Sequence, residues 1–169
     1  MTAAFAMIEP RECFIRLGGA LAFAGVLGIN RDLHHKPAGL RTHGLVALGA
    51  ALVTLVALQL AGPETGAGGA GDAVIRIIQG VITGVGFLCG GVILHGSTPD
   101  NVFGLTTAAS IWLAAALGIA CGAGLWSTAW LTTGLALAVL VLGGSVERGV
   151  HKVLDRMAPR DGGGSGKTG

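Results

Sequence analysis

Charged residues are scarce in this sequence and tyrosine is absent: Asp, Glu, Lys and Arg make up 12% of the 169 residues. Soluble domains carry about 25% charged residues, so the composition excludes an ordinary soluble domain. The few charges are also segregated. Four apolar runs contain no Asp, Glu, Lys or Arg, and they cover residues 42–60, 77–94, 105–125 and 126–146. Because a helix needs about 20 apolar residues to cross a bilayer, we expect an integral membrane protein.

Residues that carry chemistry are equally sparse. The three cysteines, Cys13, Cys89 and Cys121, form no C-x-x-C pair and fall in or beside apolar runs, which favours packing over metal or disulfide chemistry. Ser127, Thr106 and the histidines form no visible set of nucleophile and base. We therefore expect no catalytic residues, no cofactor-binding residues, no cofactor and no enzyme activity.

A metal site has one weak candidate, because His34, His35 and His43 cluster beside Asp32. Their nitrogens and oxygens suit a metal ion. Adjacent histidines in a polar connector are, however, more often solvated or turned toward lipid headgroups. We expect no metal-binding residues.

The pattern predicts an all-α membrane protein of about five helices in a Gly-rich bundle. The expected domain covers residues 1–145, with spans at about 13–29, 42–60, 74–94, 105–123 and 126–143, followed by a short cytoplasmic amphipathic helix at 146–158 and a disordered tail at 159–169. A cleaved secretory signal at the N-terminus is the alternative for the first span. Against it, Glu9 and Glu12 dilute the basic region, and the apolar run continues to Ile29.

Basic residues predict the orientation, because short loops rich in Lys and Arg stay in the cytoplasm. The first connector holds Arg31, Lys36 and Arg41, and the C-terminal region holds Arg148, Lys152, Arg156, Arg160 and Lys167. Five spans place both clusters on the same side. We expect a periplasmic N-terminus and a cytoplasmic C-terminus in a bacterial inner membrane.

Glycine is abundant, with 31 residues, and small residues let helices approach closely in lipid. Spacings of four residues join Gly80 to Gly84 and Gly86 to Gly90 in the third span. We expect these four glycines to pack helices together, either inside the bundle or as the face of a homodimer. Gly118 and Gly122 share the same spacing in the fourth span.

Contacts with lipids or with a partner protein are expected at polar residues near the first connector and the fourth span: Arg31, Lys36, Arg41, Thr106, Thr107 and Ser110. Carboxylates are absent from the span interiors, whereas a Mg²⁺ path normally needs anionic oxygen ligands. The sequence therefore gives little support to Mg²⁺ transport.

Three blocks together resemble the MgtC/SapB family of bacterial inner-membrane proteins. They are Gly25–Arg31 with Lys36-Pro-Ala-Gly-Leu-Arg-Thr-His43 and Ala47-Leu-Gly-Ala50, then Gln79–Leu88 with Gly91–Leu94, then Gly104–Gly118. The resemblance covers the membrane region, and we expect no soluble C-terminal domain of the kind that the virulence-factor members carry. Asn30 and Phe103 depart from the family, which usually has Glu and a basic or polar residue there.

The resemblance implies a regulator of other membrane machinery, linked to growth in low Mg²⁺ (magnesium homeostasis) or to intracellular survival in virulence. Its implied partners are membrane lipids and another integral membrane protein, with the proton-translocating ATP synthase as one candidate. A homodimer is an alternative, and no nucleic acid is expected. The alternative function is a transporter or channel for Mg²⁺ or another small solute.

Overall fold

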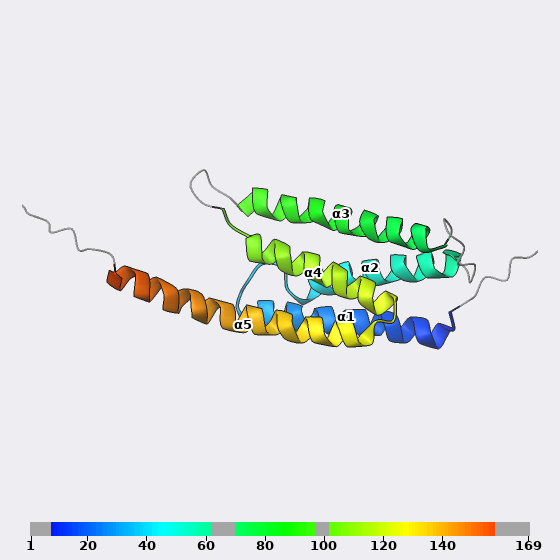
Figure 1. Cartoon of the computed structure of the whole chain (residues 1–169), viewed down its shortest axis with the longest axis horizontal. Helices are drawn as coiled ribbons and strands as arrows, with labels where there is room; N and C mark the ends of the chain where they lie inside the picture. Colours follow the sequence, from blue (N-terminus) through cyan, green and yellow to red (C-terminus); the bar gives the residue numbers. More distant parts are fainter. Residues whose placement is uncertain (1–7, 62–69, 97–101, 158–169) are drawn as a thin grey trace, which may run out of the picture.

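The computed structural model describes residues 8–61, 70–96 and 102–157, and over these residues it contains five α-helices and no strand (Figure 1). The helices are α1 (Pro10–Leu33), α2 (Leu40–Ala61), α3 (Ala70–Gly96), α4 (Leu105–Gly122) and α5 (Trp126–Met157). Each contains a stretch long and apolar enough to cross a membrane. The predicted fold class, an all-α membrane bundle, is confirmed.

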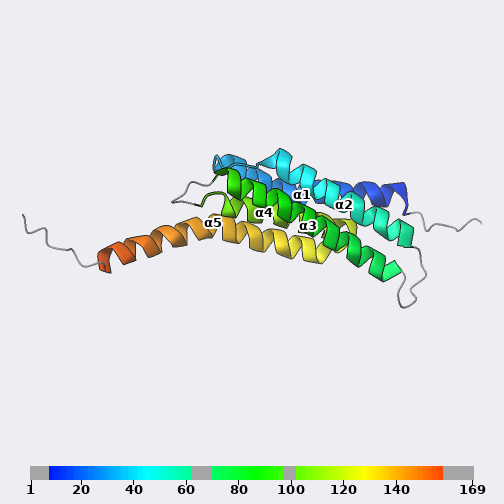
Figure 2. The same cartoon turned by 90° about the horizontal axis from the view of Figure 1, so that it is seen from above.

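The helices are longer than the predicted spans at most ends. Helix α1 begins at Pro10, where proline suits the first helical position because its missing N–H would have no partner there. Residues 146–157, which we expected as a separate short helix, instead continue α5 without a break. The far end of α5 extends beyond the bundle, at the same end as the α1–α2 connector (Figures 1 and 2). The tail at 159–169 lies outside the described residues.

Helix α4 is the centre of the bundle, because it contacts all four other helices. Helices α1 and α2 pack against it and against each other, α3 covers α2 and α4, and α5 lies on α1 and α4 (Figure 1). Among the described residues α3 and α5 do not touch. Helix α4 is accordingly the most buried candidate span, and α3 is the least buried.

Close backbone packing joins α2 to α4 at two glycines. A Cβ atom placed on Gly122 would lie 2.7 Å from the carbonyl oxygen of Ala51, and one on Gly118 would overlap the backbone of Ala47. Ala47 and Ala51 are themselves fully buried. Since helices in lipid associate through close contact of small residues, the α2–α4 pair is the structural core of the fold.

A second apolar cluster attaches α3. Val85 and Cys89 of α3 pack with Ala108, Ile111 and neighbouring residues of α4 and α2. The Cys89 thiol donates a hydrogen bond to the carbonyl oxygen of Ala108 at 3.1 Å. Cys89 therefore acts as a small packing residue, as its sequence setting predicted.

The α4–α5 turn closes the other end of the bundle. Gly124 adopts a left-handed conformation (φ +76°), Leu125 N donates to Ala120 O, and Gly124 N donates to Cys121 O. These two bonds form the Schellman pattern that ends a helix. Arg16 of α1 connects α1 to this turn, because its guanidinium donates a hydrogen bond to Gly122 O at 2.9 Å.

Helix α5 has a smaller contact with the rest of the bundle. Trp126 fills the space above Gly19 of α1, where a Cβ atom would lie 2.5 Å from the indole ring. One turn further on, Trp130 meets Phe23 edge to face, with ring centroids 4.8 Å apart. These aromatic contacts hold the first half of α5 against α1.

Candidate functional site

Six polar side chains are buried among the described residues, and they are unevenly distributed: Arg31, His43, Thr54, Thr107, Ser110 and Thr133. Four of them lie near the cytoplasmic end expected from the sequence, where α1, α2 and α4 meet beside the α1–α2 connector. Thr54 and Thr133 lie deeper in the spans. The polar cluster beside the connector is the candidate functional site.

Arg31, in the last turn of α1, is the one buried cation of this cluster and is 3% exposed. One guanidinium nitrogen donates to the hydroxyl of Thr107 on α4 and, at 3.3 Å, to the carbonyl oxygen of Pro37 in the connector. The Nε atom has no hydrogen-bond partner. The guanidinium therefore lies between the connector and α4, held by neutral oxygens alone.

No carboxylate compensates this charge within the part of the chain that the structure describes. The ion pair found there joins Arg16 to Glu12, at the opposite end of α1. Moving an arginine out of water costs several kcal/mol, and neutral acceptors recover less of this than a carboxylate would. The burial of Arg31 in this position therefore costs folding free energy.

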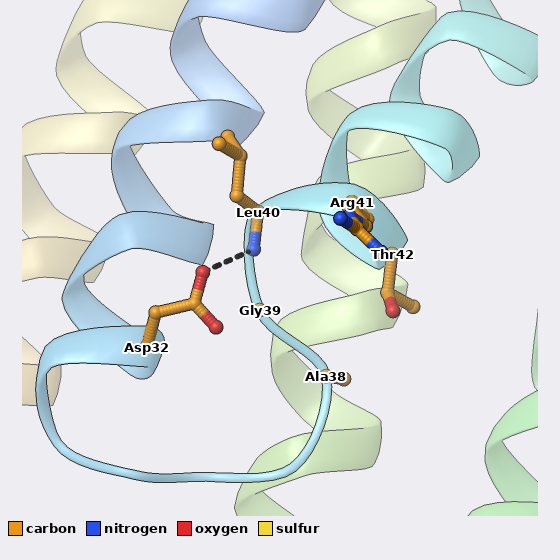
Figure 3. A pocket seen from close by; sticks show the side chains of 6 residues that line it. All are labelled: Asp32, Ala38, Gly39, Leu40, Arg41 and Thr42. Carbon is orange, nitrogen blue, oxygen red and sulfur yellow. Dashed lines mark hydrogen bonds between the residues drawn. The ribbon is translucent and has the colours of Figure 1, made fainter.

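The connector folds back onto the end of α1. The carbonyl oxygen of Arg31 accepts hydrogen bonds from the amides of His34 (3.2 Å) and Lys36 (3.0 Å), and Asp32 O accepts one from His35 N. The Asp32 carboxylate accepts a bond from Leu40 N at 2.9 Å, which caps the first turn of α2 (Figure 3). The α1–α2 hairpin is therefore closed by bonds to two consecutive residues.

The backbone of the connector is strained. His35 (φ 50°) and Ala38 (φ 60°) are in the left-handed region without being glycine. Gly39 has no room for a side chain, because a Cβ atom would overlap the Asp32 carboxylate. Each left-handed residue other than glycine costs about 1–2 kcal/mol. The hydrogen bonds of the connector therefore maintain its backbone conformation, which its residues would not adopt by their intrinsic preference.

A depression lies beside the connector and the start of α2, and Figure 3 shows the side chains that line it. Asp32, Ala38, Gly39, Leu40, Arg41 and Thr42 line it. Its one carboxylate already caps α2, and no group of three metal-ligating side chains occurs among the described residues. The depression therefore offers no set of ligands for a metal ion.

His43 has a fixed role inside α2. Its side chain is fully buried, and Nδ1 lies 2.9 Å from the carbonyl oxygen of Gly39. Because a carbonyl can only accept, Nδ1 carries the hydrogen and donates it. Nε2 has no partner. His34 and His35 are exposed, so the histidine cluster seen in the sequence is divided between the interior and the surface.

The residues expected to contact lipids or a partner separate into two groups. Lys36, Arg41 and Thr106 are exposed, so their side chains can make such contacts. Arg31, Thr107 and Ser110 are buried. In the observed conformation these side chains bond inside the bundle, because Arg31 and Thr107 bond to each other and Ser110 donates to Thr107 O at 2.8 Å. Their contact with lipids or a partner stays a prediction.

The burial of Arg31 had a signal in the sequence that our interpretation missed. The buried face of α1 repeats at helical spacing through Ala20, Ala24 and Leu27, and Arg31 is the next position on that face. The apolar pattern therefore leads directly to Arg31. We assigned Arg31 to the connector because the predicted helix ended at residue 29.

The four glycines of α3 do not pack against the bundle. A Cβ atom on Gly80, Gly84, Gly86 or Gly90 would meet no described atom within 4 Å, and three of the four are exposed. The expectation that they pack helices inside this bundle is wrong, because α3 turns Val85 and Cys89 toward α4 instead. A homodimer contact through these glycines stays a prediction. Gly118 and Gly122 make the close approach.

Comparison with known proteins gives consistent matches over the membrane region. The MgtC family model matches residues 17–149. Protein SrpB of Synechococcus elongatus is 44% identical over 131 residues, which are 74% of this chain and 71% of that protein. Protein MgtC of Brucella abortus (strain 2308) is 38% identical over 126 residues, or 75% of this chain and 49% of that protein.

A third relative carries a functional name. YhiD of Escherichia coli (strain K12) is 38% identical over 129 residues, 76% of this chain and 59% of that protein, and its name gives it a provisional role as a magnesium transporter. The chain thus spans about half of the Brucella protein and somewhat more of YhiD. No solved structure matches the chain.

Proposed function

Because the chain belongs to the MgtC family of membrane proteins, we propose that this multi-pass membrane protein regulates other membrane machinery and does not itself carry Mg²⁺. The proposal places it in a bacterial inner membrane, with the α1–α2 connector and the end of α5 in the cytoplasm. It acts there by contact with another integral membrane protein, in adaptation to Mg²⁺ limitation or to survival inside host cells, and it catalyses no reaction.

One observation carries the case against Mg²⁺ transport: the buried charge found inside the described bundle is positive. Arg31 is 3% exposed and unpaired with any described carboxylate. The other buried polar side chains are neutral hydroxyls and an imidazole. A Mg²⁺ ion requires oxygen ligands, carboxylates among them, and a fixed cation on its path would repel it.

The packing between α2 and α4 supports the same conclusion. Ala47 and Ala51 lie against the backbone of Gly118 and Gly122 without space for one methyl group. A hydrated ion could not pass between helices that touch in this way. The close contact of α2 with α4 therefore supports the proposal that no Mg²⁺ path runs between these two helices.

A transporter is the second candidate, and the name of YhiD favours it. The deciding measurement is Mg²⁺ uptake into proteoliposomes that contain a Mg²⁺-sensitive dye. We expect a signal no larger than in protein-free liposomes, while a divalent-cation ionophore added at the end gives full uptake. A saturable signal that depends on the protein would establish transport instead.

Helix α3 is the surface that we propose for the partner, because Gly80, Gly84, Gly86 and Thr83 are exposed and the other described residues do not cover them. A photo-crosslinking residue at Thr83, compared with one at Leu135 of α5, which is also exposed, tests this in native membranes. A product specific to position 83 is expected. A subunit of the ATP synthase in that product would identify the partner implied by the family, whereas a product of twice the chain mass would indicate a homodimer. Equal products from both positions would contradict the role of α3.

Membrane lipids are further proposed partners, through Lys36 and Arg41. Both side chains are exposed on the connector and the first turn of α2, where a membrane–water interface would lie. Their positive charges suit anionic headgroups.

A further inference from the structure

We propose that residues 34–39, the connector, form a releasable strap over Arg31, and that the phosphate of an anionic phospholipid is the ligand that draws Arg31 out from beneath it. The inference adds a conformational change to the proposed lipid contact of Lys36 and Arg41. Its readout is separate from Mg²⁺ flux and from crosslinking to a partner.

In the closed state, with the strap lying over Arg31, most of the bonds join the strap to the end of α1, while Gly39 O at its other end accepts from His43 N and Nδ1 of α2. Arg31 O accepts from His34 N and Lys36 N, Asp32 O accepts from His35 N, and the guanidinium of Arg31 donates to Pro37 O. Asp32 holds the far end of the strap through Leu40 N. Because these bonds share two residues of α1, the strap can open as a unit.

Two features raise the free energy of the closed state and so favour opening of the strap. The first is backbone strain at His35 and Ala38, both of which are left-handed residues with side chains. The second is the guanidinium of Arg31, which is buried with Nε unpartnered and with neutral acceptors only. Opening the strap relieves both, since it frees the backbone and returns the cation to a polar environment.

A phosphate group provides what the closed state lacks. An arginine binds a phosphate through paired, charge-assisted hydrogen bonds, which are roughly twice as strong as bonds to neutral acceptors. A ligand shifts an equilibrium only by the difference in its affinity for the two states. Arg31 beneath the strap cannot reach a phosphate, whereas Arg31 released from it can extend its long side chain to the headgroup level.

The position of the strap makes a lipid the fitting source of that phosphate. Arg31 lies at the end of a candidate membrane span, and the exposed Lys36 within the strap and Arg41 just after it lie at the same end of the bundle. In the open state three cations would therefore face the headgroup layer together, where each basic residue contributes attraction to anionic lipid.

Hydrogen–deuterium exchange of the full-length protein in vesicles tests the inference. The measured amides are those of His34, His35, Lys36 and Leu40, each of which donates a hydrogen bond in the closed state. We expect exchange to be about tenfold faster in phosphatidylcholine vesicles that contain phosphatidylglycerol than in phosphatidylcholine alone, in line with a gain of one charge-assisted bond. Equal exchange in the two vesicles would overturn the inference.

Matched variants separate the strap from general surface charge. Arg31→Gln should lose the response to phosphatidylglycerol, whereas Arg76→Gln, which removes an exposed arginine of α3 outside the proposed lipid site, should keep it. An equal loss in both variants would mean that the lipid acts on overall charge and not through Arg31. Inorganic phosphate added to phosphatidylcholine vesicles should have no effect; a full response to it would replace the lipid with a soluble anion.

Two further variants keep the test informative if Arg31→Gln fails to fold. Ala38→Gly removes the left-handed strain and should slow exchange in phosphatidylcholine by about fivefold. Thr107→Val removes an acceptor of the closed state and should speed exchange there by about fivefold, without any anionic lipid. Unchanged exchange in both variants would show that strain and the Thr107 bond do not control the strap.

Discussion

The guanidinium of Arg31 donates to the hydroxyl of Thr107, a residue 76 positions later in the chain. This bond joins the end of α1 to the first turn of α4, and Pro37 O accepts from the same nitrogen. A single side chain thus ties together the two helices and the connector.

Thr107→Val should destabilise the protein by about 1–3 kcal/mol, because a buried charged donor loses its acceptor while the shape of the side chain is kept. Thr106→Val is the matched control, since Thr106 is exposed and should change stability by less than about 0.5 kcal/mol. Unfolding in detergent, followed by circular dichroism with a chemical denaturant, measures both. Equal effects would mean that the Arg31 bond contributes nothing.

Gly118→Ala should destabilise the bundle by about 1–3 kcal/mol, because the added methyl group would overlap the backbone of Ala47. Gly84→Ala adds the same methyl group to α3, where no described atom lies within 4 Å, and the monomer should tolerate it. Thermal unfolding of the two variants in a detergent that keeps the protein monomeric provides the comparison. A loss at Gly84 as large as that at Gly118 would contradict the assignment of the close contact to α2 and α4.

Gly124→Ala should destabilise the α4–α5 turn by about 1–2 kcal/mol, because alanine is strained at φ +76°. Gly134→Ala, in the open interior of α5, should be neutral or stabilising by up to about 1 kcal/mol, since alanine is the better helix former. The two substitutions are chemically identical, so opposite signs in an unfolding measurement would isolate the conformation of the turn. The same sign for both would argue against it.

Labelling of single cysteines in a cysteine-free background tests the proposed orientation. The α1–α2 connector and the α4–α5 turn lie at opposite ends of the bundle (Figure 1). Lys36→Cys should react only after a membrane-permeant reagent is added, and Leu125→Cys should react with an impermeant reagent from outside. Reaction of both from the same side would exclude the arrangement of five spans, and the reverse pattern would invert the orientation.

The sequence predicted the helices well because hydropathy determines where a chain crosses a membrane. It predicted the neighbours of each helix poorly. Gly80 with Gly84 and Gly118 with Gly122 show the same spacing, yet only the second pair meets another helix within the described bundle. Spacing shows that a helix can approach closely, whereas the direction in which it faces depends on the tertiary arrangement.

The polar cluster beside the connector could be predicted from the sequence in part. The apolar face of α1 extends to Arg31, and this periodicity could have placed the cation inside the bundle. Its acceptor could not have been found in this way, because Thr106 and Thr107 are alike in the sequence and one is exposed while the other is buried. One residue of helical rotation, about 100°, separates a surface hydroxyl from a buried one.

The central position of α4 also has a consequence for biosynthesis. Membrane helices enter the bilayer in the order of their synthesis, and the α1–α2 hairpin is complete long before α4 emerges from the ribosome. During that interval Arg31 has no Thr107 to bind, and Ala47 and Ala51 have no Gly118 or Gly122 to cover them. The nascent hairpin must therefore keep its cation at the headgroup level until the fourth helix arrives.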